Sequence, residues 1–98
     1  MPIEVEVGQE FAITLRSNPT TGYQWQLVGL SDADIVKLVG SEYKGPEAEL
    51  VGAGGEEVWT FQATSQGETA VSLEYIRPWE KDVPPAEARI FTVLVRQP

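Results

Sequence analysis

The sequence has neither His nor Cys among its 98 residues, so few enzyme mechanisms remain open to its side chains. These absences exclude Ser-His and Cys-His nucleophile systems, zinc sites with His or Cys ligands, disulfides and the commonest general base. Acidic pairs such as Asp32 with Asp34, or Glu56 with Glu57, can form calcium sites or the carboxylates of a glycosidase. Neither pair has the regular oxygen spacing of an EF-hand loop, and adjacent strand residues point to opposite faces. We therefore expect solvated charges there and assign no catalytic residue, metal site or cofactor.

A glycine-rich segment suggests a phosphate-binding loop at first sight. This segment, which we call the glycine loop, consists of Gly52, Ala53, Gly54 and Gly55. No Lys-Ser or Lys-Thr pair follows it, and Glu56 with Glu57 would place negative charge beside a phosphate. Two interpretations stay open. The segment is either a flexible hairpin loop or a stretch whose missing side chains let its backbone approach the backbone of a partner.

A second segment combines residues that together specify a stiff, tight loop. This threonine loop consists of Asn18, Pro19, Thr20, Thr21, Gly22 and Tyr23. Asn can bond its own backbone, Pro fixes φ, and Gly permits a positive φ. A plain turn between two strands would explain those three residue types, but it would not explain Thr20 and Thr21.

A third segment, the tryptophan loop, consists of Arg77, Pro78 and Trp79. Trp and Arg are enriched among the hot spots of protein interfaces, and Pro78 stiffens the connection between them. Because the loop is followed by the polar stretch 80–85, Trp79 would expose a large apolar area unless something covers it. Either Trp79 folds as a cap onto the end of the domain, or a partner covers it.

These three loops lie between runs in which apolar and polar residues alternate with the period of β-strands. We expect seven strands, at about residues 3–7, 11–15, 23–27, 35–43, 58–63, 68–76 and 88–95. Residues 31–34 have turn chemistry, and stretch 80–85 is predicted to be a loop because Pro84 and Pro85 lack the N–H donor. The alternation predicts outward-facing Gln24 and Gln26, and it predicts an inner face formed by Phe11, Ile13, Leu15, Tyr23, Trp25, Leu27, Trp59, Phe61, Ala63, Val71, Leu73 and Tyr75.

Seven short strands with a turn roughly every 8–12 residues are typical of an all-β fold, an immunoglobulin-like antiparallel β-sandwich. The chain length fits one domain, which we expect to span residues 1–98. If the seven strands are lettered A to G in chain order, the three loops are the B–C, D–E and F–G connections. They are thus every second connection of the sandwich. Since successive connections alternate between the two ends, we expect the three loops to form one binding surface.

The net charge of the chain limits the classes of partner that it can bind. A net charge of −8, with seven basic residues scattered among fifteen acidic ones, argues against nucleic acid and anionic membranes as partners. No apolar run approaches the roughly 20 residues of a spanning helix, and the first residues lack the profile of a signal peptide. We expect a monomer that is either cytoplasmic or a matured secreted or periplasmic form.

The three loops, in this order and at these intervals, resemble the chagasin family, the immunoglobulin-like inhibitors of papain-like cysteine proteases found in protozoa and prokaryotes. Family members carry an NPTTG loop followed by Phe or Tyr, then a GxGG loop, then an RPW loop. All three occur here, at residues 18–23, 52–55 and 77–79. The resemblance covers nearly the whole chain, and three motifs in order are far more specific than any one of them.

The resemblance implies a wedge that blocks the active-site cleft of a protease such as papain or a cathepsin L-type enzyme. Thr20, Thr21 and Gly22 would approach the catalytic cysteine, and the glycine loop would lie along the non-primed substrate groove. Arg77 and Trp79 would grip the primed side. Inhibition by such a wedge is expected to be reversible, competitive and non-covalent.

Two other classes of function are compatible with parts of the sequence. An immunoglobulin-like adhesion or ligand-binding module could use the same loop end for a carbohydrate or a surface protein, with Trp79, Gln24 and Gln26 as contacts. An enzyme is a distant third, because nucleophile, general base and metal ligands are all missing.

Overall fold

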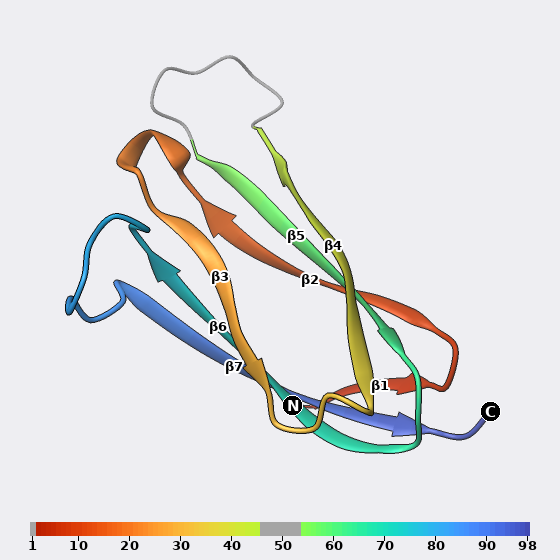
Figure 1. Cartoon of the computed structure of the whole chain (residues 1–98). Helices are drawn as coiled ribbons and strands as arrows, with labels where there is room; N and C mark the ends of the chain where they lie inside the picture. Colours follow the sequence, from red (N-terminus) through yellow and green to blue (C-terminus); the bar gives the residue numbers. More distant parts are fainter. Residues whose placement is uncertain (1, 46–53) are drawn as a thin grey trace.

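The computed structural model describes residues 2–45 and 54–98, and these form seven strands and one short 3-10 turn. The strands pair into a four-stranded sheet in the order β1-β7-β6-β3 and a three-stranded sheet in the order β2-β5-β4 (Figure 1). The elements are β1 (Ile3–Glu6), β2 (Glu10–Ser17), η1 (Pro19–Thr21), β3 (Gln24–Leu30), β4 (Val36–Lys44), β5 (Gly55–Ala63), β6 (Gly67–Ile76) and β7 (Glu87–Arg96). The immunoglobulin-like sandwich expected from the sequence is confirmed.

Two details of the strands differ from the expectation. β5 begins at Gly55 instead of Val58, because Gly55 still pairs with Ser17 at the end of β2. β1 pairs with β7 in parallel, so the sandwich is not antiparallel throughout. The parallel pair arises because the chain turns at Gly8, whose φ of 94° suits glycine, and continues as β2 in the other sheet.

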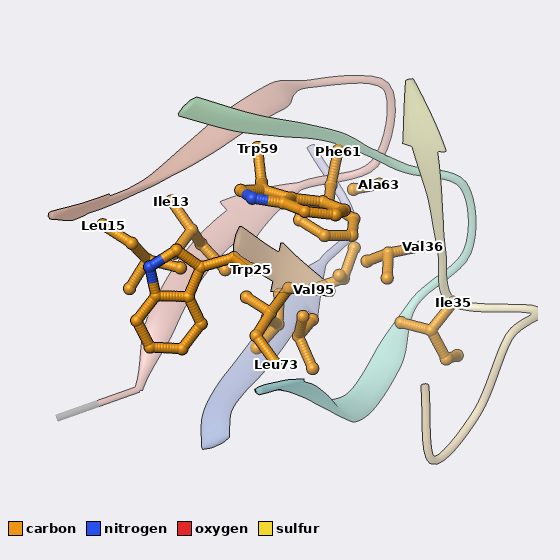
Figure 2. Close-up of a cluster of buried hydrophobic side chains, with 12 residues drawn as sticks. Ile13, Leu15, Trp25, Ile35, Val36, Trp59, Phe61, Ala63, Leu73 and Val95 are labelled. Carbon is orange, nitrogen blue, oxygen red and sulfur yellow. The ribbon is translucent and has the colours of Figure 1, made fainter. Parts of the chain in front are cut away.

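The core lies between the two sheets, where their apolar faces meet. Figure 2 shows Trp59 and Phe61 of one sheet facing Leu73 and Val95 of the other. Each predicted inner-face residue is buried or half-buried, whereas Gln24 and Gln26 are exposed as predicted. Burial of one large apolar side chain stabilises the fold by about 1.5–3 kcal/mol. The buried apolar residues are Ile13, Leu15, Trp25, Ile35, Val36, Trp59, Phe61, Ala63, Val71, Leu73, Val93 and Val95.

The described parts of the three loops lie at one end of this sandwich, which we call the loop end. It is formed by the threonine loop, by the β6–β7 connection at residues 77–86 and by Gly54, which precedes β5 (Figure 1). The strand register places Ser17 opposite Gly55 in one sheet and Gln24 opposite Ile76 in the other, so paired strands within each sheet end together at the loop end. No helix in the described part of the chain is long and apolar enough to cross a membrane.

Candidate functional site

The threonine loop is held by hydrogen bonds between its own residues. Asn18 Oδ1 accepts from the Thr20 N–H at 3.2 Å and from the Thr20 hydroxyl at 2.6 Å. The Asn18 carbonyl oxygen accepts from the Thr21 N–H at 3.1 Å and from the Thr21 hydroxyl at 2.7 Å. These bonds close the 3-10 turn η1. The two threonines, which turn chemistry left unexplained, therefore use their hydroxyls to stiffen the loop from within.

The base of the threonine loop is tied to both sheets. The Asn18 N–H donates to the Tyr75 hydroxyl on β6 at 2.9 Å, and the Trp25 indole Nε1–H donates to the Arg16 carbonyl on β2 at 2.9 Å. The Tyr75 ring lies 5.1 Å from the Tyr23 ring and 5.0 Å from the Trp25 ring, centroid to centroid. Aromatic pairs at such separations contribute about 0.5–1.5 kcal/mol beyond the area they bury. The rings of Tyr23, Trp25 and Tyr75 therefore form a rigid aromatic base to which the threonine loop is anchored.

Arg77 of the tryptophan loop contacts the threonine loop. Its Nε donates to the Thr21 carbonyl oxygen at 3.1 Å, and its guanidinium carbon lies 4.4 Å from the centroid of the Tyr23 ring. Its Nη1 also lies 4.0 Å from a carboxylate oxygen of Glu80. The planar, always charged guanidinium suits both the stacking and the hydrogen bond. Arg77 thus joins two loops that lie far apart in the sequence.

Trp79 remains largely in solvent, with 65% of its surface exposed. The buried-cap interpretation is therefore wrong for the isolated chain. One part of its indole ring lies against Gly22, where an added Cβ would overlap the ring, and Gly22 has a φ of 84°. Gly22 is thus required twice, by its backbone conformation and by the close approach of Trp79.

The described part of the glycine loop lies beside the threonine loop. A Cβ added at Gly54 would come within 3.2 Å of the Ser17 carbonyl oxygen and 3.4 Å of the Asn18 Cβ. A Cβ at Gly55, now part of β5, would overlap the Lys44 carbonyl oxygen. Both glycines therefore permit a close backbone approach. Gly52 and Ala53, which the sequence also placed in this surface, lie outside the described residues.

The residue that sequence reasoning missed is Glu57. Its carboxylate accepts from the Ser17 hydroxyl at 2.7 Å, from the Trp25 N–H at 3.1 Å and from the Trp59 indole Nε1–H at 3.3 Å. The expectation of a solvated charge was wrong for Glu57, although Glu56 beside it is exposed. The signal was present in the sequence, because Glu57 continues the period of two that places Trp59 on the inner face.

The other acidic pair has a structural explanation. Asp32 Oδ1 accepts from the Asp34 N–H at 3.0 Å, which stabilises the turn before β4. Within residues 2–45 and 54–98, no group of three acidic side chains is arranged to hold a metal ion. The described part of the loop end is therefore held by hydrogen bonds and by packed aromatic rings.

Comparisons with known proteins agree with this geometry. A family model described as "Chagasin family peptidase inhibitor I42" matches residues 4–95. Chagasin of Trypanosoma cruzi is 36% identical over 97 residues, which cover 96% of this chain and 86% of that protein. Among solved structures, the cysteine protease inhibitor EhICP2 of Entamoeba histolytica has a TM-score of 0.84 at 27% identity, covering 97% of this chain and 86% of its own. PbICP-C, solved in complex with falcipain-2, has a TM-score of 0.78 at 19% identity, covers 98% and 87% of the two chains and supports the fold alone.

Proposed function

Since the chain belongs to the chagasin family of cysteine protease inhibitors, we propose that it inhibits papain-like cysteine proteases reversibly, competitively and without covalent chemistry. Its loop end is proposed to occupy the active-site cleft. The observation that carries this proposal is that the described part of the loop end is already formed in the chain without a partner. The threonine loop is closed by its own hydrogen bonds, and Trp79 stands exposed beside Gly22.

The parts of the loop end take different roles in this proposal. Thr20, Thr21 and Gly22 form the tip that approaches the catalytic cysteine. The glycine loop, with Gly52, Ala53, Gly54 and Gly55, lies along the groove by main-chain contact. The close approach of Gly54 to Asn18 supports a continuous surface across these two loops.

The tryptophan loop divides its work between two side chains. Trp79 supplies exposed aromatic area, and burial of such area beneath a partner is the usual basis of an interface hot spot. Arg77 is occupied within the inhibitor, by Thr21, Tyr23 and Glu80. We therefore assign Arg77 to holding the loops in place and Trp79 to gripping the protease, with Pro78 keeping the spacing between them.

Rigidity explains how a surface without a reactive group can bind tightly. Protease–inhibitor interfaces bury on the order of 800 Å² on each partner, and their affinity depends on how little order must be gained on binding. Here the loop hydrogen bonds and the aromatic base already fix the conformation. The entropy cost of binding is correspondingly small.

A titration of papain with the purified protein tests the proposal, with trypsin as the control. Residual peptidase activity should fall to zero near an equimolar ratio, recover on dilution, and show an apparent inhibition constant that rises with substrate concentration. Trypsin activity should not change. Loss of activity that does not recover on dilution would contradict the non-covalent mechanism. Full papain and cathepsin L activity at micromolar protein would contradict the proposed function.

A further inference from the structure

We propose that Glu57 is a positioning residue that fixes both ends of the threonine loop, an inference that rests on the proposed function. The residues it binds flank this loop. Ser17 is the last residue of β2, directly before the loop, and Trp25 is the second residue of β3, directly after it. Glu57 itself lies on β5, which leaves the glycine loop. One carboxylate therefore joins three strands that enter or leave two of the binding loops.

The bond to Trp25 crosses between the sheets. β5 and β2 belong to the three-stranded sheet, and β3 is an edge strand of the four-stranded sheet. Because β3 has a strand partner only on its β6 side, the Trp25 N–H donates to the Glu57 side chain instead of to a strand carbonyl. Trp25 is only 4% exposed, so water is a poor substitute for that acceptor. Loss of Glu57 would remove the main-chain tie of β3 to the opposite sheet and leave the bond from the Trp25 indole to the Arg16 carbonyl on β2.

The donor set calls for a carboxylate and not for an amide. Glu57 Oε2 accepts from the Ser17 hydroxyl and the Trp25 N–H, and Oε1 accepts from the Trp59 indole. A glutamine has one accepting oxygen, so its NH2 group would face one of these donors. Ser17 is 4% exposed, which leaves its hydroxyl equally dependent on this acceptor. A Gln at this position should retain only part of the arrangement.

The consequence reaches the second loop through Arg77. The Thr21 carbonyl oxygen that Arg77 binds belongs to the threonine loop, and so does the Tyr23 ring beneath its guanidinium. A shift of the loop base therefore also changes the support of the tryptophan loop. Glu57 lies on the wall of an open groove of about 680 Å³, which Gln24, Tyr43 and Pro78 also line. Its effect on a protease is indirect, through the loop conformation.

The test compares Glu57→Leu and Glu57→Gln with Glu56→Gln, which removes the same charge from the exposed neighbour on the same strand. Inhibition of papain is measured at a temperature at which each variant is fully folded. Glu57→Leu should raise the inhibition constant by about tenfold or more, because the donors of three buried residues, Ser17, Trp25 and Trp59, lose their acceptor. Glu57→Gln should lie between Glu57→Leu and the unchanged protein, and Glu56→Gln should match the unchanged protein.

A core variant separates positioning from stability. Val93→Ala removes a fully buried side chain on β7, away from the loop end, and should lower the unfolding midpoint while leaving the inhibition constant unchanged. If Val93→Ala weakened inhibition as much as Glu57→Leu did at comparable stability, Glu57 would be only a structural residue. The same holds if folded Glu57→Leu inhibited papain as well as the unchanged protein does.

Amide hydrogen exchange keeps this inference separate from the proposed function. The Trp25 and Thr21 amides should exchange faster in Glu57→Leu and at the original rate in Glu56→Gln, whether or not papain is inhibited. If the unchanged protein failed to inhibit, these rates would still decide whether Glu57 holds the loop. Should Glu57→Leu fail to fold, Ser17→Ala removes one donor alone. Unchanged exchange and inhibition in both Ser17→Ala and Glu57→Gln would overturn the proposal.

Discussion

The threonine loop and the β6–β7 connection that carries Trp79 lie side by side, yet they are stabilised in different ways. The threonine loop contains its own supports, since Asn18, Thr20 and Thr21 bond to one another. The β6–β7 connection has a backbone turn in which the Glu80 N–H donates to the Arg77 carbonyl at 3.0 Å, and its Arg77 and Trp79 side chains contact the threonine loop.

One of the two loops therefore serves as the support for the other. The threonine loop would keep its shape without its neighbour, because its hydrogen bonds are local. The tryptophan loop needs Thr21, Tyr23 and Gly22 as the surface on which Arg77 and Trp79 rest. A change in the threonine loop should therefore disturb both loops, whereas a change in the tryptophan loop should affect that loop alone.

The largest effect is expected from Gly22→Ala, which breaks the contact between the two loops. An L-residue at a φ of 84° costs about 1–2 kcal/mol, and the new Cβ would overlap the Trp79 ring. We expect the papain inhibition constant to rise about a hundredfold, which corresponds to about 2.8 kcal/mol. Near-ultraviolet circular dichroism should show the changed Trp79 environment.

Gly29→Ala is the matched control for this variant, because a Cβ added at Gly29 meets nothing within 4 Å. It should inhibit papain as the unchanged protein does. If Gly22→Ala behaved like this control, the close contact between Gly22 and Trp79 would have no role in inhibition.

The next effect is expected from Trp79→Ala, which removes the exposed part of the supported loop. Because the indole is 65% exposed, stability should change little. The inhibition constant should rise about thirtyfold, in line with about 2 kcal/mol for an aromatic hot spot. Val83→Ala, another exposed apolar residue of the same connection, serves as the control. An inhibition constant within threefold of the original would remove Trp79 from the proposed interface.

A smaller effect is expected from Arg77→Lys, which tests the tie between the loops directly. Lysine keeps the charge but loses both the directed bond to the Thr21 carbonyl and the planar stacking on Tyr23. We expect the inhibition constant to rise about fivefold, for a loss of about 1 kcal/mol. Full inhibition by Arg77→Lys combined with weak inhibition by Arg77→Ala would show instead that the charge acts on the protease.

The smallest effect is expected from Thr21→Val, which removes the Thr21 hydroxyl from the threonine loop and preserves the shape of the side chain. That hydroxyl donates to the Asn18 carbonyl at 2.7 Å and accepts from the Tyr23 N–H at 3.4 Å, and its loss should raise the inhibition constant about threefold, because the other bonds of the loop remain. Thr14→Val on the exposed face of β2 provides the control. A larger effect than that of Trp79→Ala would mean that the threonine loop depends on this one hydroxyl.

Much of the fold could be predicted because its strands have one face toward solvent and one face toward the core. The alternation around Trp59 and Phe61 follows directly from that arrangement, and it predicted the burial of both. The parallel pairing of β1 with β7 could not be predicted in the same way. A strand of four residues shows which side chains are apolar, but its partner is decided by the turn at Gly8 and by the sheet it reaches.

The site was predictable in its residue types more than in their contacts. Turn chemistry indicated a stiff threonine loop, whereas the polar stretch after Trp79 left open whether the indole caps the domain or is covered by a partner. The turn of Arg77 toward Tyr23 depends on the distance between two connections, which no local pattern encodes. The inward orientation of Glu57 could have been predicted from the sequence, since its spacing from Trp59 places it on the inner face. Its acidic neighbour Glu56 suggested a solvated pair instead.

The parallel pairing of β1 with β7 also determines how the domain would respond to mechanical force. Because Ile3 lies beside Val93 and Glu6 beside Arg96, tension applied between the first and last residues pulls these two strands past each other along their length. Their hydrogen bonds would then share the force and fail together in shear, instead of opening one after another like a zip. Single-molecule stretching between the two ends should show one abrupt rupture, and a gradual extension at low force would contradict this expectation.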